Sequence, residues 1–190
     1  FSGNLFEHSP LGISCAAVAH DEVKFWQAVP NLSKEENQQM VRDLMAYAEA
    51  GYSFVTWNGC GFDFRLLAEE SGMFEECGKL ALNHVDLMLL VTFTKGWFLG
   101  LDKALKGAGI AGKVKELPLK SGEILHDMNG GMAPKLWKDG EYDAVLTYLR
   151  GDVEQTLALA ENVAETRKIR WTSGRGKPQS VSVPRLMTVR

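Results

Sequence analysis

The segment that most constrains the fold is a strand, a turn and a helix over residues 52–72. It begins with Tyr-Ser-Phe-Val-Thr-Trp, an aromatic and β-branched run that predicts a buried strand. The strand ends at Asn58-Gly59-Cys60-Gly61, where two glycines permit a tight turn. Residues 62–71 then predict a helix that ends at Gly72. A buried strand that leads straight into a helix is typical of α/β domains.

The sequence on both sides extends this α/β pattern. Residues 12–19 and 23–26 are apolar runs around a polar turn, which predicts an antiparallel hairpin. Ser33 and Glu36 form a capping-box pattern ahead of a helical repeat that lasts until Gly51. The remaining predictions are helices at 87–94, 100–108 and 141–166, irregular structure at 109–134 and a strand at 169–172. This order predicts an α/β fold, a mixed β-sheet flanked by helices.

Composition restricts the class of protein. Hydrophobic residues make up 45% of the chain and charged residues 24%, which is typical of globular proteins and not of disordered ones. The longest apolar runs, such as residues 85–93, are too short and too polar to cross a bilayer. Residues 1–9 lack the basic start and apolar run of a secretory signal. We therefore expect a cytoplasmic protein with no membrane partner.

Charge is distributed unevenly along the chain. The net charge of −3 argues against a broad basic surface for nucleic acid. The segment 166–190, however, contains no acidic residue and seven basic ones: Arg167, Lys168, Arg170, Arg175, Lys177, Arg185 and Arg190. This segment could contact phosphates, or it could be a solvated extension. We accordingly expect a domain over residues 1–166 and a basic C-terminal extension over residues 167–190.

The cysteines indicate neither a disulfide framework nor a zinc knuckle. Cys15, Cys60 and Cys77 are odd in number and contain no CxxC pair. We expect all three to be small buried apolar residues.

Two aspartates are candidates for chemistry. Asp63 opens the helix after the glycine turn, beside the edge of the sheet, although an acid there is also an ordinary N-terminal helix residue favoured by the macrodipole. Asp152 lies in the long helix, with Tyr148 one turn before it. The predicted apolar stripe of that helix is Val145, Leu146, Leu149, Val153, Leu157 and Ala160.

The stripe places Asp152 at its edge, so its carboxylate is expected to point toward the sheet. Burying a carboxylate is costly unless a cation or hydrogen bonds compensate, which makes Asp152 either a metal ligand or a satisfied half-buried acid. Gly151 beside it costs about 1 kcal/mol relative to alanine in a helix interior and therefore needs a packing or functional reason.

Together, the two segments carry a family resemblance. The pattern NxxxFD at residues 58–63, followed about ninety residues later by YxxxD at residues 148–152, resembles the second and third motifs of the DEDDy exonucleases. Residues 84–88, 99–102 and 136–141 are similar to bacterial exonuclease-like proteins related to the polymerase B proofreading domain. The resemblance extends to about residue 161 and implies an RNase H-like fold.

The resemblance implies a 3′–5′ exonuclease that hydrolyses phosphodiester bonds at single-stranded 3′ ends of DNA or RNA. Asp63 and Asp152 would bind two divalent ions, and Tyr148 would orient or help deprotonate the attacking water. Asn58 and Phe62 would be the substrate-binding residues. Asn58 would also brace the turn, and Phe62 could stack on a terminal base, although core packing is an alternative use of its ring. Hard oxygen ligands and the lack of a cysteine or histidine cluster favour Mg²⁺ or Mn²⁺ over zinc.

The sequence departs from the family in its first motif, an Asp-x-Glu on the first strand. No such pair occurs near the N-terminus, although Phe1-Ser2-Gly3 resembles the residues that follow it in relatives. We therefore expect the pair upstream of Phe1. Without it, the chain would be a catalytically inactive RNase H-like module that binds nucleic acid or protein, and an accidental motif match is a third alternative.

Four other polar residues are auxiliary candidates: His84, His126, Asp86 and Asp127. In the sister DEDDh subgroup a histidine serves as the general base, but here Tyr148 takes that position, so we expect His126 to be structural. Asp86 is expected to cap the helix that starts at Leu87.

Overall fold

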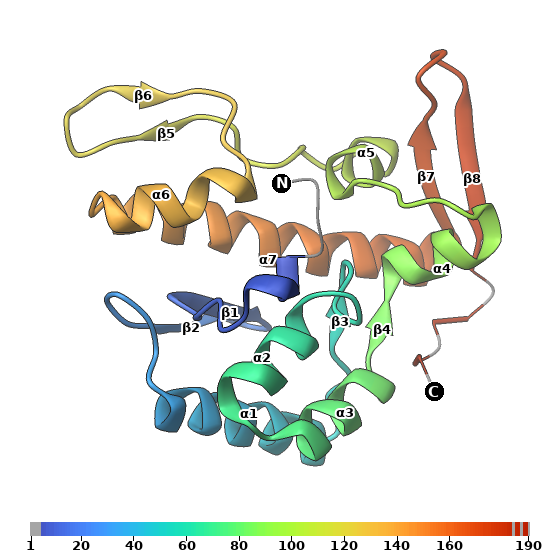
Figure 1. Ribbon diagram of the computed structural model, residues 1–190. Coiled ribbons are helices and arrows are strands. Elements are labelled where there is room, and N and C mark those ends of the chain that lie inside the picture. The colour runs from blue at the N-terminus through green and yellow to red at the C-terminus, as the bar shows by residue number, and fades with distance from the viewer. Residues whose placement is uncertain (1–4, 184, 187, 190) are drawn as a thin grey trace. The chain divides into compact units, whose positions relative to one another are not determined.

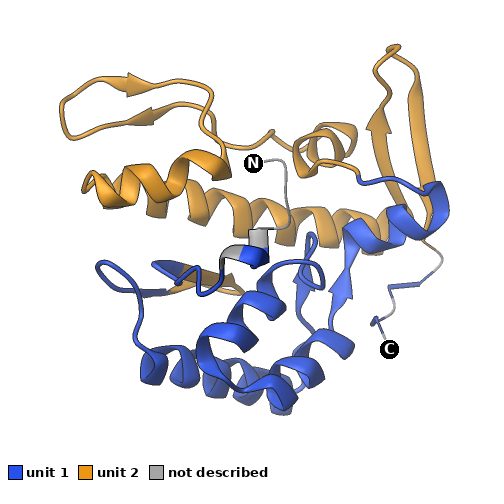
Figure 2. Cartoon of the chain, in the orientation of Figure 1, with its two compact units in different colours: residues 1–15, 26–98, 185–190 blue, residues 16–25, 99–184 orange. Residues whose placement is uncertain are grey.

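The computed structural model describes residues 5–183, 185, 186, 188 and 189. The chain separates into two compact units (Figure 2). Unit 1 takes the described residues of 1–15, 26–98 and 185–190, and unit 2 takes those of 16–25 and 99–184. Residues 1–3, on which part of the family resemblance rests, lie outside the described residues.

Three helices that pack against one another form much of unit 1 (Figure 1). They are α1 (Lys34–Glu49), α2 (Asp63–Ser71) and α3 (Phe74–Leu82). The predicted capping box starts α1: Ser33 Oγ accepts a bond from the Glu36 backbone, and the Glu36 carboxylate accepts one from the Ser33 backbone. Gly72 ends α2 in the left-handed region at φ 75°, as the sequence predicts. Helix α3 was not predicted, because no side chain caps its start.

The parallel strands of unit 1 are short. Strand β3 (Val55–Thr56) pairs with β4 (Val85–Asp86), with Val55 opposite Val85 and Thr56 opposite Asp86. The prediction of a strand over all of residues 52–57 was wrong. The Tyr52 backbone N–H bonds to Tyr47 O, and the Tyr47 ring contacts the rings of Tyr52 and Phe54. The aromatic residues of this run therefore pack against the end of α1 and do not extend the ladder.

Helix α4 (Leu87–Lys95) follows β4 directly, and a short 3₁₀ helix, η1 (Leu5–His8), precedes the first hairpin. That hairpin consists of β1 (Cys15–Ala19) and β2 (Val23–Gln27), as predicted from the sequence. The turn between them, residues 20–22, lies in unit 2.

Unit 2 is built on the long helix α7 (Tyr142–Thr166), which contacts α5 (Leu101–Gly107) and α6 (Ala133–Lys138). A small hairpin, β5 (Leu117–Pro118) and β6 (Ile124–Leu125), and the 3₁₀ helix η2 (Gly130–Met132) interrupt the irregular stretch. The α/β class is confirmed, and the strands of the described residues form four two-stranded sheets.

The predicted strand near residue 169 is confirmed as β7 (Lys168–Thr172), and it pairs with an unpredicted strand, β8 (Pro178–Ser182). Ile169, Trp171 and Val181 are buried in this hairpin, which packs against α5. Much of the basic C-terminal segment is therefore part of the core of unit 2.

Across the described residues, no helix combines the length and apolarity that a membrane span requires.

Candidate active site

The Asp86 carboxylate binds the backbone of the turn between β3 and α2. Asp86 Oδ1 accepts a hydrogen bond from the Asn58 backbone at 3.0 Å, and its Oδ2 accepts one from the Cys60 backbone at 3.2 Å. Asn58 itself takes the left-handed conformation, with φ 76°. A Cβ at Gly61 would lie 2.5 Å from Asn58 Oδ1, so a larger residue there would have to displace the Asn58 side chain. The motif residues 58–63 therefore form a rigid turn, and a substrate contact of Asn58 stays a prediction.

Asp86 also caps helix α4, as the sequence predicts. Its Oδ1 accepts bonds from the backbones of Met88 and Leu89, both at 3.1 Å. The residue is only 3% exposed, and four backbone N–H groups in all compensate its charge. The cap prediction missed the second role, in which Asp86 joins the β3–α2 turn to the start of α4.

Asp63 is the first residue of α2 and is exposed. Desolvation of its carboxyl and the nearby Asp86 charge raise its pKa to about 6, although its own backbone N–H acts in the opposite direction. Because the residue as a whole remains open to water, this shift carries little energy. Asp63 is thus a surface carboxylate with a weakened preference for the charged form.

Phe62 lies beside Asp63 and is 37% exposed. Its ring centroid is 5.9 Å from that of Phe6, and the Arg65 guanidinium lies 3.9 Å from the centre of the Phe6 ring. These three side chains place two aromatic rings and a positive charge next to Asp63 in unit 1. Stacking of a base on Phe62 stays a prediction.

In unit 2, Tyr148 and Asp152 lie one turn apart on α7, and both face inward. Tyr148 is 6% exposed, and the side chain of Asp152 is 23% exposed. The cation that compensates Asp152 is Lys113, whose Nζ lies 2.7 Å from Asp152 Oδ2 and 4.9 Å from the centre of the Tyr148 ring. Sequence reasoning missed Lys113, because it comes from the irregular stretch 109–134, which has no pattern that fixes its orientation.

The ion pair does not fully satisfy Asp152. Burial raises the pKa of Asp152, and hydrogen bonds to Lys113 and Tyr148 counter that rise only in part. Burial alone would lower the pKa of Lys113, but its bonds to the same two residues outweigh burial and raise it. The two shifts disagree about how well the pair is compensated. The geometry explains both shifts. The Lys113 ammonium is well bound by Asp152 Oδ2, whereas Asp152 Oδ1 is buried without a hydrogen-bond partner among the described residues.

Gly151 has a packing reason. A Cβ at this position would lie 2.8 Å from Val114 Cγ2. Gln155 Nε2 donates a bond to Gly112 O at 3.0 Å, so residues 112–114 run close along α7. The glycine lets this segment approach and thereby positions Lys113 on Asp152.

The predicted stripe of α7 needs correction. The fully buried residues of the helix are Ala144, Val145, Tyr148, Leu159, Ala160 and Val163. Leu146, Leu149, Val153 and Leu157 are only half-buried. The buried line is therefore rotated toward Tyr148, because segment 112–114 covers that side of the helix.

A hollow of about 430 Å³ lies elsewhere in unit 2. The hairpin turn His20, Asp21 and Glu22 and the α7 residues Arg150 and Glu154 contribute to its lining. Tyr148 and Asp152 do not line it, so the hollow does not coincide with the candidate chemistry.

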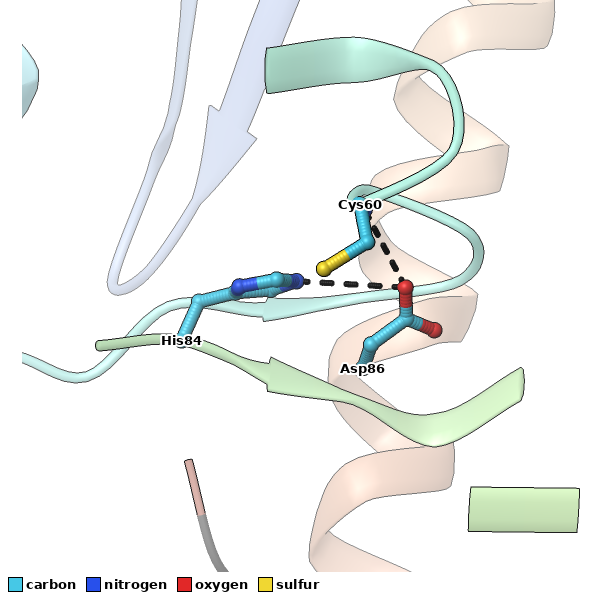
Figure 3. Close-up of side chains that lie close together, drawn as sticks. All are labelled: Cys60, His84 and Asp86. Atoms are coloured by element: carbon cyan, nitrogen blue, oxygen red, sulfur yellow. Dashed lines mark hydrogen bonds and ion pairs between the residues drawn. The ribbon is translucent and has the colours of Figure 1, made fainter. Parts of the chain in front are cut away.

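Cys60, His84 and Asp86 form a cluster in unit 1 that corrects one sequence prediction (Figure 3). The sequence indicated no cysteine and histidine cluster, because Cys60 and His84 stand far apart in the chain and no short motif joins them.

Cys77 is buried as expected, whereas Cys15 and Cys60 are half-buried. His126 is exposed and pairs with Glu116, and Asp127 has φ 56° in the loop after β6.

The structure thus groups the predicted site residues by unit. Asn58, Phe62 and Asp63 belong to unit 1, and Tyr148 and Asp152 belong to unit 2.

The family model described as RNase H superfamily, RNase_H_2, matches residues 8–164. The chain therefore belongs to the RNase H superfamily. Searches of curated proteins and of solved structures found no significant match.

Membership of the RNase H superfamily suggests nuclease activity on nucleic acids, and nucleases of this superfamily typically use divalent metals. Asp63 in unit 1 and Asp152 in unit 2 each offer a carboxylate to such an ion. Asp152 Oδ1 is a buried acceptor without a partner among the described residues, and Asp63 is a surface carboxylate. Both are hard oxygen donors of the kind that Mg²⁺ and Mn²⁺ prefer. Lys113 is the competitor for Asp152.

Proposed function

We propose that this RNase H-like protein is a 3′–5′ exonuclease that hydrolyses phosphodiester bonds at single-stranded 3′ ends of DNA or RNA. The observation that carries the proposal is the half-buried Asp152, which has one unpartnered carboxylate oxygen next to Tyr148. A buried acceptor left unpaired costs free energy, so a helix retains one when it serves a purpose other than stability. The YxxxD and NxxxFD motifs and the superfamily match support the same conclusion.

Asp63 and Asp152 are the carboxylates that would hold the metal. Two divalent ions, Mg²⁺ or Mn²⁺, would activate a water and stabilise the leaving 3′ oxygen. The Tyr148 hydroxyl, one turn before Asp152 on the same helix, would orient that water. Phe62, the exposed ring beside Asp63, would stack on the terminal base.

A metal ion at the unpartnered Oδ1 of Asp152 would compete with Lys113, which holds Oδ2, for the charge of the same carboxylate. Its ammonium is attached through a flexible four-carbon stem, so it can leave the carboxylate without a change in the backbone. A substrate phosphate is a suitable second partner for it. In this proposal, Lys113 compensates Asp152 until a metal ion replaces it.

The test is a product-resolved assay on the full-length protein. A 5′-labelled single-stranded oligonucleotide with Mn²⁺ is expected to give a ladder that shortens one nucleotide at a time from the 3′ end. Asp152→Asn and Asp63→Asn should each lower the rate at least about 100-fold, whereas Asp143→Asn, an exposed acid on the same helix, should not. Internal cuts would indicate an endonuclease and would overturn the end specificity.

A catalytically inactive module that binds nucleic acid or protein is the second candidate. The Lys113–Asp152 ion pair favours it, because the lysine compensates the carboxylate without any metal. If the full-length protein leaves single-stranded DNA and RNA intact but retains them in a binding assay, this second function replaces the first.

A further inference from the structure

A second polar cluster lies in unit 1, apart from the residues assigned to the nuclease. Cys60 comes from the turn between β3 and α2, His84 immediately precedes β4, and Asp86 ends β4 (Figure 3). One ligand atom from each residue, a thiol sulfur, an imidazole nitrogen and a carboxylate oxygen, lies within 4.8 Å of the other two. Thiolate, imidazole and carboxylate are the side-chain groups that bind zinc in proteins.

The imidazole of His84 is held in the tautomer that a metal needs. Its Nδ1 lies 2.7 Å from Ala81 O, and because a carbonyl can only accept, Nδ1 carries the hydrogen. Nε2 therefore carries the lone pair. His84 is 0% exposed, and its Nε2 has no hydrogen-bond partner among the described residues. Histidine ligands of metals commonly donate their other ring nitrogen to a backbone carbonyl in this way.

The carboxylate of Asp86 has a spare acceptor on the same side. Three of its four backbone bonds go to Oδ1, and Oδ2 accepts only one, from Cys60 at 3.2 Å. Oδ2 lies 3.9 Å from His84 Nε2. Both side chains are at most 1% exposed, so the space between the two atoms is closed to bulk water.

Charge favours a divalent cation in this space. A thiolate at Cys60 is disfavoured in the metal-free protein, since burial and the Asp86 charge both raise the pKa of that thiol. One thiolate and one carboxylate carry two negative charges in total, which a divalent ion cancels. The resulting group is neutral and can remain buried, whereas either anion alone is costly there.

We propose that Cys60, His84 and Asp86 bind a zinc ion. Ligand atoms of a tetrahedral zinc site lie about 3.5 Å apart, so the 3.9 Å between Nε2 and Oδ2 and the wider separations in the cluster, up to 4.8 Å, have to shorten on binding. On binding, a Zn–S bond replaces the S–H bond of Cys60, and the thiol proton passes to solvent. The mixed sulfur, nitrogen and oxygen set distinguishes this site from the oxygen-only site proposed for Mg²⁺ or Mn²⁺.

Zinc at this site would tie the β3–α2 turn to the end of β4. Two backbone hydrogen bonds to the Asp86 carboxylate already join these two segments. The same turn leads into α2 at Asp63. Because zinc would join these two segments, it is expected to raise the melting temperature of the protein.

The experiment uses the full-length protein, stripped of metal with a chelator, and Co²⁺ as the spectroscopic probe. Co²⁺ is expected to bind with one ion per chain at this site, with a sulfur-to-cobalt charge-transfer band in the near ultraviolet that added Zn²⁺ removes. Cys60→Ala should abolish the band, and the matched variant Cys15→Ala, at another half-buried cysteine, should keep it. Asp152→Asn should also keep it, so failure of the nuclease proposal leaves this test unaffected.

A second measurement needs no variant and avoids any folding defect. Alkylation mapped by mass spectrometry should show Cys60 protected by Zn²⁺ and Cys15 unchanged. Absence of the charge-transfer band, or alkylation of Cys60 at the same rate with and without Zn²⁺, would overturn the zinc site. The cluster would then be a buried thiol and imidazole pair without a metal.

Discussion

Lys113 Nζ lies 2.7 Å from Asp152 Oδ2, with only about a quarter of either side chain exposed. This ion pair links the irregular stretch 109–134 to the face of α7 that also carries Tyr148. It explains how a carboxylate can lie on the inner face of a helix in the metal-free protein, since the lysine supplies the compensating charge. It also makes the behaviour of Asp152 depend on whether a second cation is present.

Lys113→Met is expected to lower the free energy of unfolding by about 1–3 kcal/mol in a chelator, because it leaves the half-buried Asp152 without its cation. If a metal ion takes the place of the ammonium, Mn²⁺ should restore part of this loss. Urea denaturation with EDTA and with Mn²⁺ measures both effects.

The control is Lys106→Met, which removes an exposed pair with Asp102 four residues away in α5. Exposed pairs of this kind contribute about 0.3–0.5 kcal/mol. Equal losses for the two lysine variants, or a loss at Lys113 that Mn²⁺ leaves unchanged, would contradict the proposed exchange.

Two glycines allow a matched test of packing in the separate units. A Cβ at Gly107 would lie 2.1 Å from Arg170 O, so Gly107→Ala should separate α5 from β7 and cost about 2–3 kcal/mol. A Cβ at Gly78, inside α3, meets nothing within 4 Å, and Gly78→Ala should stabilise by about 0.5–1 kcal/mol through helix propensity. Urea midpoints measure both, and a destabilised Gly78→Ala would show that α3 packs differently.

His84 should make stability depend on pH. Burial lowers the pKa of His84 below its ordinary value of 6.5, so the fold favours the neutral ring. Its contribution to stability is present above pH 6.5 and is lost as the pH falls through the folded pKa. In a chelator, wild-type protein should therefore lose up to about 1.4 kcal/mol per pH unit through this group below pH 6.5.

Unfolding curves between pH 7 and pH 5 measure the pH dependence of stability for wild type and His84→Gln. The difference between the two slopes is the contribution of His84, because the acids of the chain contribute to both proteins alike. His126→Gln, at an exposed histidine, is the control and should keep the wild-type slope. A His84→Gln slope equal to that of wild type would show that folding leaves the pKa of the imidazole unchanged and would contradict the prediction.

The sequence predicted the elements whose signals are local. The capping box of Ser33 and Glu36, the Gly72 stop and the Asp86 cap are contacts between residues a few positions apart, and all three were confirmed. Helix α3 and strand β8 escaped prediction. The first has no capping side chain, and the second depends on pairing with β7, a contact that its own residues do not reveal.

The candidate sites also divide into residues that local sequence signals place and residues that only long-range contacts place. Asp63 at the start of α2 follows from the glycine turn, and helical periodicity predicts that Asp152 is partly buried. The predicted direction of the Asp152 carboxylate, toward the sheet, was wrong, because it pairs with Lys113. Lys113 could not be predicted, because its place depends on how closely residues 112–114 approach Gly151. The meeting of Cys60 with His84 depends on the register of β3 against β4, which two-residue strands do not reveal in the sequence.

The most direct test of the nuclease account is whether Asp63 and Asp152 bind the same cations. Calorimetric titration with Mn²⁺ should measure the affinity of four forms of the full-length protein: wild type, Asp63→Asn, Asp152→Asn and the double variant. If the carboxylates share the ions, each single variant should weaken binding at least about 10-fold, and the double variant should lose less free energy than the sum of the two. Additive losses, or single variants that bind Mn²⁺ as wild type does, would contradict the account.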